Sequence, residues 1–202
     1  MAAPTSKTIY DLLKPLGLTR AQARKLLPEW WGPEMESSPS GLAELRLLLS
    51  RRLSLDVAAL SRGELARRDA QRPIAYKHHA GDDPTQLQAS TAIATALAGA
   101  VISAMPEPQR QIPAKAEAFA ALARKHGGVV GLASLIDACW ELGVPVIPMP
   151  NLPVGVRKMD GAALQVGDRK AIIVSRKKSS RAWLAFIVAH EIGHLARGHL
   201  LK

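Results

Sequence analysis

The sequence predicts an α+β protein that is mostly helical, with a short β-sheet in its C-terminal half. Aromatic residues make up only 4% of the 202 residues, so Leu, Ala, Val and Ile must build the core. This composition favours helices over a large sandwich or barrel. The apolar runs typical of strands all lie after residue 143. With 48% hydrophobic residues the chain can bury a sizeable core, which excludes collagen-like, low-complexity and mostly disordered proteins.

Residues 1–105 are predicted to form a helical region of unknown role. The run 16–23, with Thr19 as a candidate N-cap, is similar to the opening of a helix-turn-helix unit. Loop compositions follow where a recognition helix should stand, so an ordinary helical packing unit is the favoured interpretation. Leucines at helical spacing from Leu42 to Leu49 predict a further helix. Asp83 and Pro84 are typical of a helix start.

The stretch 87–105 is the most apolar part of the chain, and Ala dominates it. Gln, Ser and Thr side chains interrupt it, so we expect a buried helix and no membrane span. The prolines of segment 106–113 predict a linker, which places the main domain boundary there.

Residues 114–202 are predicted to form a second domain that carries the sheet. Two helices, an edge strand, a hairpin and a last helix are expected in chain order. Gly143 should end the second helix, prolines restrict the first strand to a sheet edge, and Ser179 or Ser180 should cap the last helix. The two helices are expected at 114–125 and 132–142, and the edge strand at 144–149. The hairpin strands are expected at 164–166 and 171–174, and the last helix at 181–201.

The chain is strongly basic, with 27 Lys and Arg against 17 Asp and Glu. Residues 151–202 hold ten basic and three acidic residues. A second basic cluster consists of Arg46, Arg51, Arg52, Arg62, Arg67, Arg68, Arg72 and Lys77. Such clusters fit contact with DNA or RNA, an acidic protein partner, or a solvated surface.

Cys139 is the only cysteine, so no intramolecular disulfide can form and a reducing compartment is the default. Residues 1–7 lack the basic flank and apolar run of a secretory signal. These features predict a cytoplasmic protein.

The last predicted helix contains His190-Glu191-Ile192-Gly193-His194, which is the H-E-x-x-H zinc motif. Residues i and i+4 lie one turn apart on one helix face, so His190 and His194 can bind one Zn²⁺ ion. Zinc makes water acidic enough to react near neutral pH, and Glu191 can carry the proton to a leaving amine. The sequence therefore predicts His190 and His194 as metal ligands and Glu191 as the catalytic residue.

A chance pairing of His and Glu on an amphipathic helix is the alternative. Apolar residues flank the motif on both sides, from Phe186 to Ala196, and predict a helix that is buried on most sides. Burying two histidines and a glutamate without a partner is costly, which favours the metal site.

The C-terminal domain resembles the ImmA/IrrE family of bacterial metallopeptidases. The likeness lies in 171–175, 181–186 and 188–195, ends at Gly198-His199, extends upstream through 132–146, and covers about residues 114–202. It implies a zincin-like core in which a short β-sheet packs on the metal helix. It also implies a zinc metalloendopeptidase whose protein substrate is a helix-turn-helix transcriptional repressor.

The sequence departs from the family pattern at the third metal ligand, which the resemblance implies is a glutamate well downstream of the second histidine. Only residues 195–202 follow His194, and none is acidic. His199 lies five residues after His194, which on a continuous helix would turn it away from the metal face. Two hypotheses follow: a truncated or split peptidase, or an inactive member that acts as a basic, DNA-associated regulatory module.

The remaining candidates are interpreted as structural. Adjacent side chains diverge, so His78 and His79 are expected at the surface. His126 is expected at a helix C-terminus and Cys139 in the core.

Overall fold

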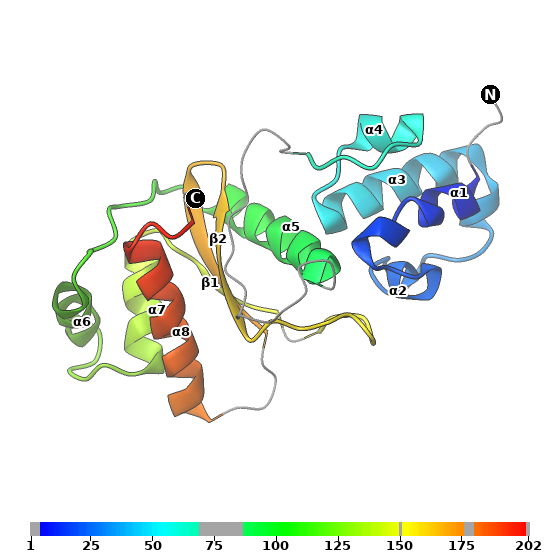
Figure 1. Ribbon diagram of the computed structural model, residues 1–202. Helices are drawn as coiled ribbons and strands as arrows, with labels where there is room; N and C mark the ends of the chain where they lie inside the picture. The colour runs from blue at the N-terminus through cyan, green and yellow to red at the C-terminus, as the bar shows by residue number, and fades with distance from the viewer. Residues whose placement is uncertain (1–4, 69–86, 150, 176–179, 201–202) are drawn as a thin grey trace. The chain divides into compact units, whose positions relative to one another are not determined.

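The computed structural model describes residues 5–68, 87–149, 151–175 and 180–200. It is an α+β fold with a three-stranded sheet, as the sequence predicts. The chain forms two compact units (Figure 1). The first comprises residues 1–71, 81–96 and 152–158, and the second comprises 72–80, 97–151 and 159–202.

This division differs from the predicted one, which places the main domain boundary at segment 106–113. Helix α5, Gln88–Ala104, runs without a break from the first unit into the second. Segment 106–113 has no helix or strand, as its prolines predict, yet it packs against the second unit. The N–H of Arg110 donates to the Leu142 carbonyl, and a Cβ on Gly143 would stand 3.0 Å from Cα of Gln109. The segment is therefore part of that unit's packing.

Short helices build the first unit. They are α1 (Ser6–Asp11), α2 (Arg20–Arg24), α3 (Pro39–Leu53), α4 (Val57–Arg62) and the start of α5, with single 3-10 turns at Lys14–Leu16 and Met35–Ser37. Thr19 caps α2, as predicted, and also forms a capping box with Gln22. Ser38 caps α3. The next α-helix after α2 begins only at Pro39, so the structure has a loop where a recognition helix would have to stand.

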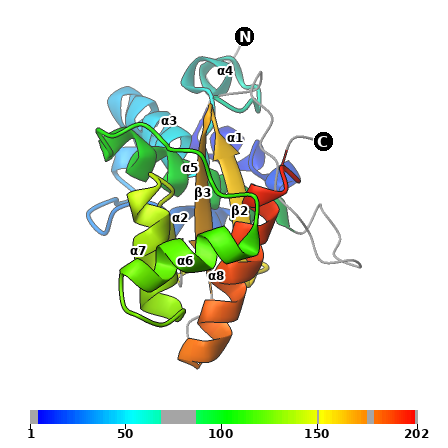
Figure 2. The ribbon, with the colours of Figure 1, turned by 90° about the vertical axis from the view of Figure 1, so that its left-hand side faces the viewer.

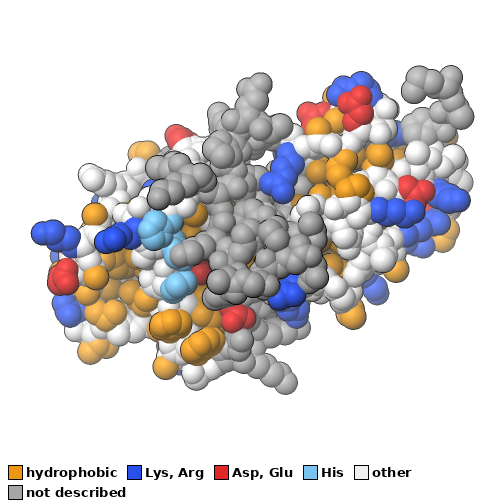
Figure 3. Space-filling view, viewed as in Figure 1, with side chains coloured by type: hydrophobic (Ala, Val, Ile, Leu, Met, Phe, Trp, Pro, Cys, Tyr) orange, Lys and Arg blue, Asp and Glu red, His pale blue; other side chains and the backbone are white. Residues whose placement is uncertain are grey.

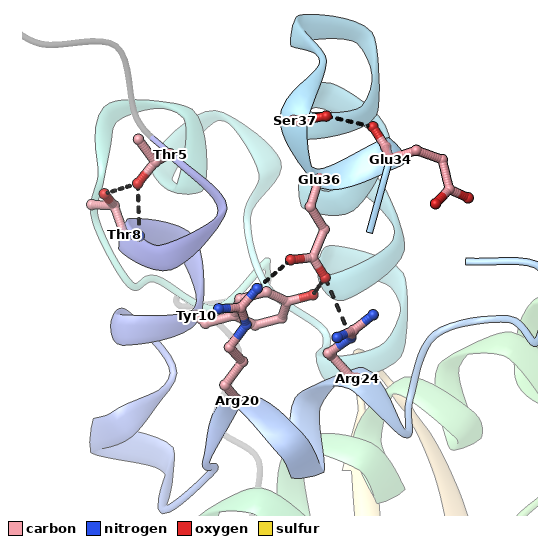
Figure 4. A network of polar contacts seen from close by, with 8 residues as sticks. All are labelled: Thr5, Thr8, Tyr10, Arg20, Arg24, Glu34, Glu36 and Ser37. Atoms are coloured by element: carbon pink, nitrogen blue, oxygen red, sulfur yellow. Dashed lines mark hydrogen bonds and ion pairs between the residues drawn. The ribbon is translucent and has the colours of Figure 1, made fainter. Parts of the chain in front are cut away.

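A polar network centred on the buried Glu36 carboxylate joins three elements of the first unit (Figure 4). The Tyr10 hydroxyl donates to the Glu36 carboxylate at 2.8 Å, and Arg20 and Arg24 of α2 form ion pairs with the same carboxylate. Burial alone would raise the pKa of Glu36. The hydrogen bonds from Tyr10 and Arg20 and the charge of Arg24 nevertheless hold that pKa below its ordinary value. Glu36 is therefore a buried carboxylate that remains ionised.

The second unit contains α6 (Ala116–Lys125), α7 (Leu132–Glu141), β1 (Val146–Pro148), β2 (Gly161–Val166), β3 (Arg169–Val174) and α8 (Arg181–Ala196). The strand order is β1-β3-β2, in which β1 is parallel and β2 antiparallel to β3. The proline-flanked strand is thus an edge strand and the hairpin forms, as predicted. Its strands are longer than predicted, because pairing starts at Gly161 and continues to Val166 and Arg169, next to the turn. Gly143 has a φ of 73°, a conformation that favours glycine, and it ends α7.

Helices α7 and α8 lie side by side against one face of this sheet, and α6 lies on the far side of α7 from the sheet (Figures 1 and 2). Ile172 on β3 is flanked by Val146 on β1 and Ala163 on β2, and this row packs under Val188 and Ile192 of α8. The apolar positions of three strands therefore set where α8 lies.

Two sequence expectations are wrong for α8. The helix ends at Ala196 and does not reach residue 201, because Gly198 has a φ of 65° and turns the chain. The helix is also not buried on most sides, since the Phe186 side chain is 58% exposed. One face of α8 packs on the sheet, and another faces solvent.

Apolar helix α5 contributes buried residues from Ala89 to Ile102, which agrees with the predicted buried helix. Across the parts of the chain that the structure describes, no helix combines the length and hydropathy that a membrane span needs. The predicted helix start at Asp83 and Pro84 lies outside the described residues.

Candidate metal centre

Helix α8 positions the predicted site residues. Its first turn is capped by Ser180, whose hydroxyl accepts the N–H of Trp183. Ile187, Ile192 and Leu195 are buried and hold the helix on the core. A second face of the helix carries His190 at the surface, and His194 follows one turn later with its side chain largely buried. Over α8, histidine side chains reach the surface with apolar side chains beside them (Figure 3).

The structure brings His190 and His194 together. Their Nε2 atoms are 3.0 Å apart, and their ring centroids are 4.5 Å apart with the planes nearly perpendicular. His190 is exposed, whereas His194 is 6% exposed. Nitrogen ligands of a tetrahedral zinc ion, at 2.0–2.1 Å from the metal, stand about 3.3 Å apart. The spacing of the two Nε2 atoms is therefore close to that of two ligands of one zinc ion.

His190 is oriented by a stack of aromatic rings along the exposed face of α8. The Phe186 ring stacks on the His190 ring with centroids 6.1 Å apart, and Trp183 stacks on Phe186 at 5.3 Å. These three residues are spaced by three and four positions, so the helix places them in one row.

Glu191 is buried at 6% exposure and lies against the start of β2. A Cβ on Gly161 would stand 3.1 Å from its Oε1 atom. Gly161 was not among the predicted site residues. Its position at the start of a strand, ahead of an apolar run, was the available signal, because glycine within a strand often marks close approach of another element.

His199 was also misjudged from the sequence. The expectation that it turns away from the histidine face assumed a continuous helix, and the helix ends at Ala196. The turn at Gly198 brings Nδ1 of His199 to 3.1 Å from Nδ1 of His194. His199 therefore contacts the side of the His194 ring that faces away from His190.

The described residues do not supply a third protein ligand for the metal. Within residues 5–68, 87–149, 151–175 and 180–200, no group of three or more His, Cys, Asp or Glu side chains is placed to hold a metal ion. His190 and His194 provide two nitrogen donors, one fewer than catalytic zinc sites usually have.

An apolar cavity of about 340 Å³ lies on the neighbouring face of α8. Phe119 of α6, Leu135 of α7 and Ile192 of α8 contribute to its walls. Ala189 and Gly193 also line it, and they directly precede the two histidines. The volume falls within the range of pockets that bind small molecules.

The other candidates behave as structural residues. His126 caps the end of α6, as predicted, and its Nε2 atom is 2.8 Å from Oε2 of Glu141. Cys139 is buried in the core of the second unit, and burial raises the pKa of its thiol to about 12. His78 and His79 lie outside the described residues, as do basic residues 176–178.

Comparison of the chain with protein-family models, curated proteins and solved structures finds no match.

Proposed function

We propose that this chain is a zinc-dependent metalloendopeptidase of the ImmA/IrrE type that cleaves a helix-turn-helix transcriptional repressor. The observation that carries the proposal is the 3.0 Å spacing of the Nε2 atoms of His190 and His194 on a helix that also carries Glu191. The short sheet against α8 supports it, because the resemblance implies that arrangement. A cytoplasmic location belongs to the same proposal, since repressors act there.

His190 and His194 would hold the zinc ion through their Nε2 atoms. When bound, the ion would supply Lewis acidity, which lets water attack a carbonyl near neutral pH. Glu191 takes the proton from the attacking water and delivers it to the leaving amine. The apolar cavity beside Ala189 and Gly193 has room for a side chain of the substrate near the scissile bond.

The first test measures zinc binding without any substrate. Untagged protein should be used, because an added histidine tag binds zinc. His190→Ala and His194→Ala should each weaken zinc binding at least tenfold, measured by competition with a chromophoric chelator. His126→Ala is the matched control, because His126 pairs with Glu141 elsewhere in the same unit and should leave the affinity unchanged. Equal zinc affinity in all four proteins would contradict the site.

The second test measures cleavage. A panel of purified helix-turn-helix repressors is incubated with the zinc-loaded chain, and fragments are identified by mass spectrometry. Cleavage that a chelator abolishes and zinc restores supports the peptidase. A zinc-binding chain that cuts no repressor supports the inactive member of this family.

A group of arginines in the first unit supports the alternative function, an inactive peptidase that binds DNA. An isolated bridge pairs Leu55 with Arg67, and the guanidinium of Arg68 donates to Ser50. These contacts bring Arg67 and Arg68 to the C-terminal end of α3, where Arg51 and Arg52 are exposed. Among the described residues, no Asp or Glu forms an ion pair with any of these four arginines.

We therefore propose DNA binding through this arginine cluster as the second candidate function. Phosphate contacts carry no sequence information, so binding should weaken steeply with salt and show little sequence preference. Arg51→Ala with Arg52→Ala should reduce affinity for a DNA duplex and lower its salt dependence. Arg62→Ala is the control, because Arg62 already pairs with Glu64. Equal affinity of the double variant and wild type would exclude this surface.

A further inference from the structure

We infer that His199 is a positioning residue that fixes which nitrogen of His194 faces the proposed metal. The inference rests on the proposed zinc site. It starts from two contacts of one ring: Nε2 of His194 is 3.0 Å from Nε2 of His190, and Nδ1 of His194 is 3.1 Å from Nδ1 of His199. The His194 imidazole is thus held at both nitrogens.

The chain turn after α8 explains why His199 reaches this place. The N–H of Arg197 donates to the Gly193 carbonyl, and the N–H of His199 donates to the His194 carbonyl at 3.2 Å. Gly198 adopts a left-handed conformation between them, which is typical of a glycine that ends a helix. Leu200 is 2% exposed and belongs to the core of the second unit, so it anchors the turn.

The chemistry of a neutral imidazole turns this geometry into a tautomer preference. One ring nitrogen carries a hydrogen and the other carries a lone pair. A His194 that binds metal through Nε2 must carry its hydrogen on Nδ1. That hydrogen needs an acceptor, and Nδ1 of His199 is in place to accept it. His199 would then carry its own hydrogen on Nε2.

Such a contact acts on the metal through the ligand. A hydrogen-bond acceptor on the far nitrogen of a histidine ligand fixes its tautomer and ring orientation and makes it a better donor. Loss of such a partner typically costs 10–100-fold in metal affinity. His190 is held differently, by stacking on Phe186, so the two ligands have independent supports.

The test compares wild type, His199→Ala and His199→Asn, all untagged. The Asn side-chain oxygen can accept the same hydrogen bond from Nδ1 of His194. We expect His199→Ala to weaken zinc binding 10–100-fold and His199→Asn to stay within a few-fold of wild type. Thermal unfolding of the metal-free proteins is recorded alongside. A structural role alone would lower the stability of both variants and would not be rescued by Asn.

A second readout does not use metal. Nitrogen-15 NMR of the metal-free chain reports which ring nitrogen of His194 carries the hydrogen. We expect the Nδ1–H form in wild type and His199→Asn, and a mixture of forms in His199→Ala. Zinc affinity and tautomer that are both unchanged in His199→Ala would overturn the inference and leave the zinc site intact. Wild-type protein that binds no zinc would overturn the proposed function, and the inference with it.

Discussion

Gly161 lies directly against Glu191: a Cβ atom on Gly161 would stand 3.1 Å from Oε1 of Glu191 and 2.5 Å from Cγ2 of Ile187. Gly161 begins β2, and the other two residues belong to α8. A strand residue with any side chain would therefore push α8 away from the sheet. The absence of a side chain at Gly161 lets the glutamate of the motif lie where it does.

Replacing Gly161 by Ala should destabilise the second unit by about 1–3 kcal/mol, the usual cost of overpacking a core. The clash falls on Ile187, whose β-branched side chain is stiff and cannot turn aside easily. Urea unfolding, monitored by hydrogen exchange in β3, measures the change. Unchanged stability would mean that α8 shifts without cost.

Gly193→Ala should have the opposite effect on stability. A Cβ on Gly193 meets no atom within 4 Å, and Gly in a helix interior is about 0.5–1 kcal/mol less favourable than Ala. The same unfolding experiment should show a gain of that size. Because Gly193 lines the apolar cavity, the added methyl group should also lower the rate of any repressor cleavage. A loss of stability would contradict the open space at this position.

Glu191→Gln should abolish repressor cleavage while zinc binding stays within a few-fold of wild type. The amide keeps the size of the side chain but cannot take a proton from water. The matched measurements are chelator competition for zinc and mass spectrometry of the repressor. Cleavage by the Gln variant would refute the catalytic role given to Glu191. Loss of zinc binding by the variant would indicate that Glu191 is a metal ligand.

The first unit should lose stability in acid because of Glu36. Its pKa in the folded chain lies below the ordinary value of 4.5, so its contribution is fully present above pH 4.5 and is lost as pH falls through the folded pKa. Glu36→Gln should cost about 1–3 kcal/mol at pH 7, because the buried network loses its charged acceptor. The variant should also show a flatter acid dependence. Hydrogen exchange in α3 between pH 3 and pH 7 tests both effects.

Cys139 should be unreactive in the native protein. Burial raises the pKa of its thiol from 9.0 to about 12, which lowers the thiolate fraction about 1000-fold at neutral pH. Iodoacetamide should label the urea-unfolded chain readily and the folded chain at a rate lower by at least that factor. Rapid labelling of the folded chain would show that the core of the second unit opens often.

Local sequence signals predicted the elements of the second unit well. Gly143 ends α7 and the prolines keep β1 at an edge, because each acts through its own backbone geometry. Ser180 caps α8 in the same local way. The closeness of the His190 and His194 side chains was also predicted correctly, because residues four positions apart lie about one turn apart on a helix.

Contacts between residues that are far apart in the sequence were revealed only by the tertiary structure. The sequence does not tell that α5 runs through both compact units, or that segment 106–113 packs on the residues around Gly143. The hydrogen bond from Tyr10 to Glu36 joins residues 26 positions apart, and no periodic pattern in the sequence reveals it.

The candidate site also combines features that the sequence predicted with features that only the tertiary structure revealed. The residue types and spacing of the motif, which are properties of one helix, were determined by the sequence alone. The close approach of Gly161 to Glu191 and the return of His199 to His194 were decided by the packing of α8 on the sheet and by the turn at Gly198. Helical periodicity is a local property of the backbone, whereas the contacts of a side chain depend on where packing brings the rest of the chain.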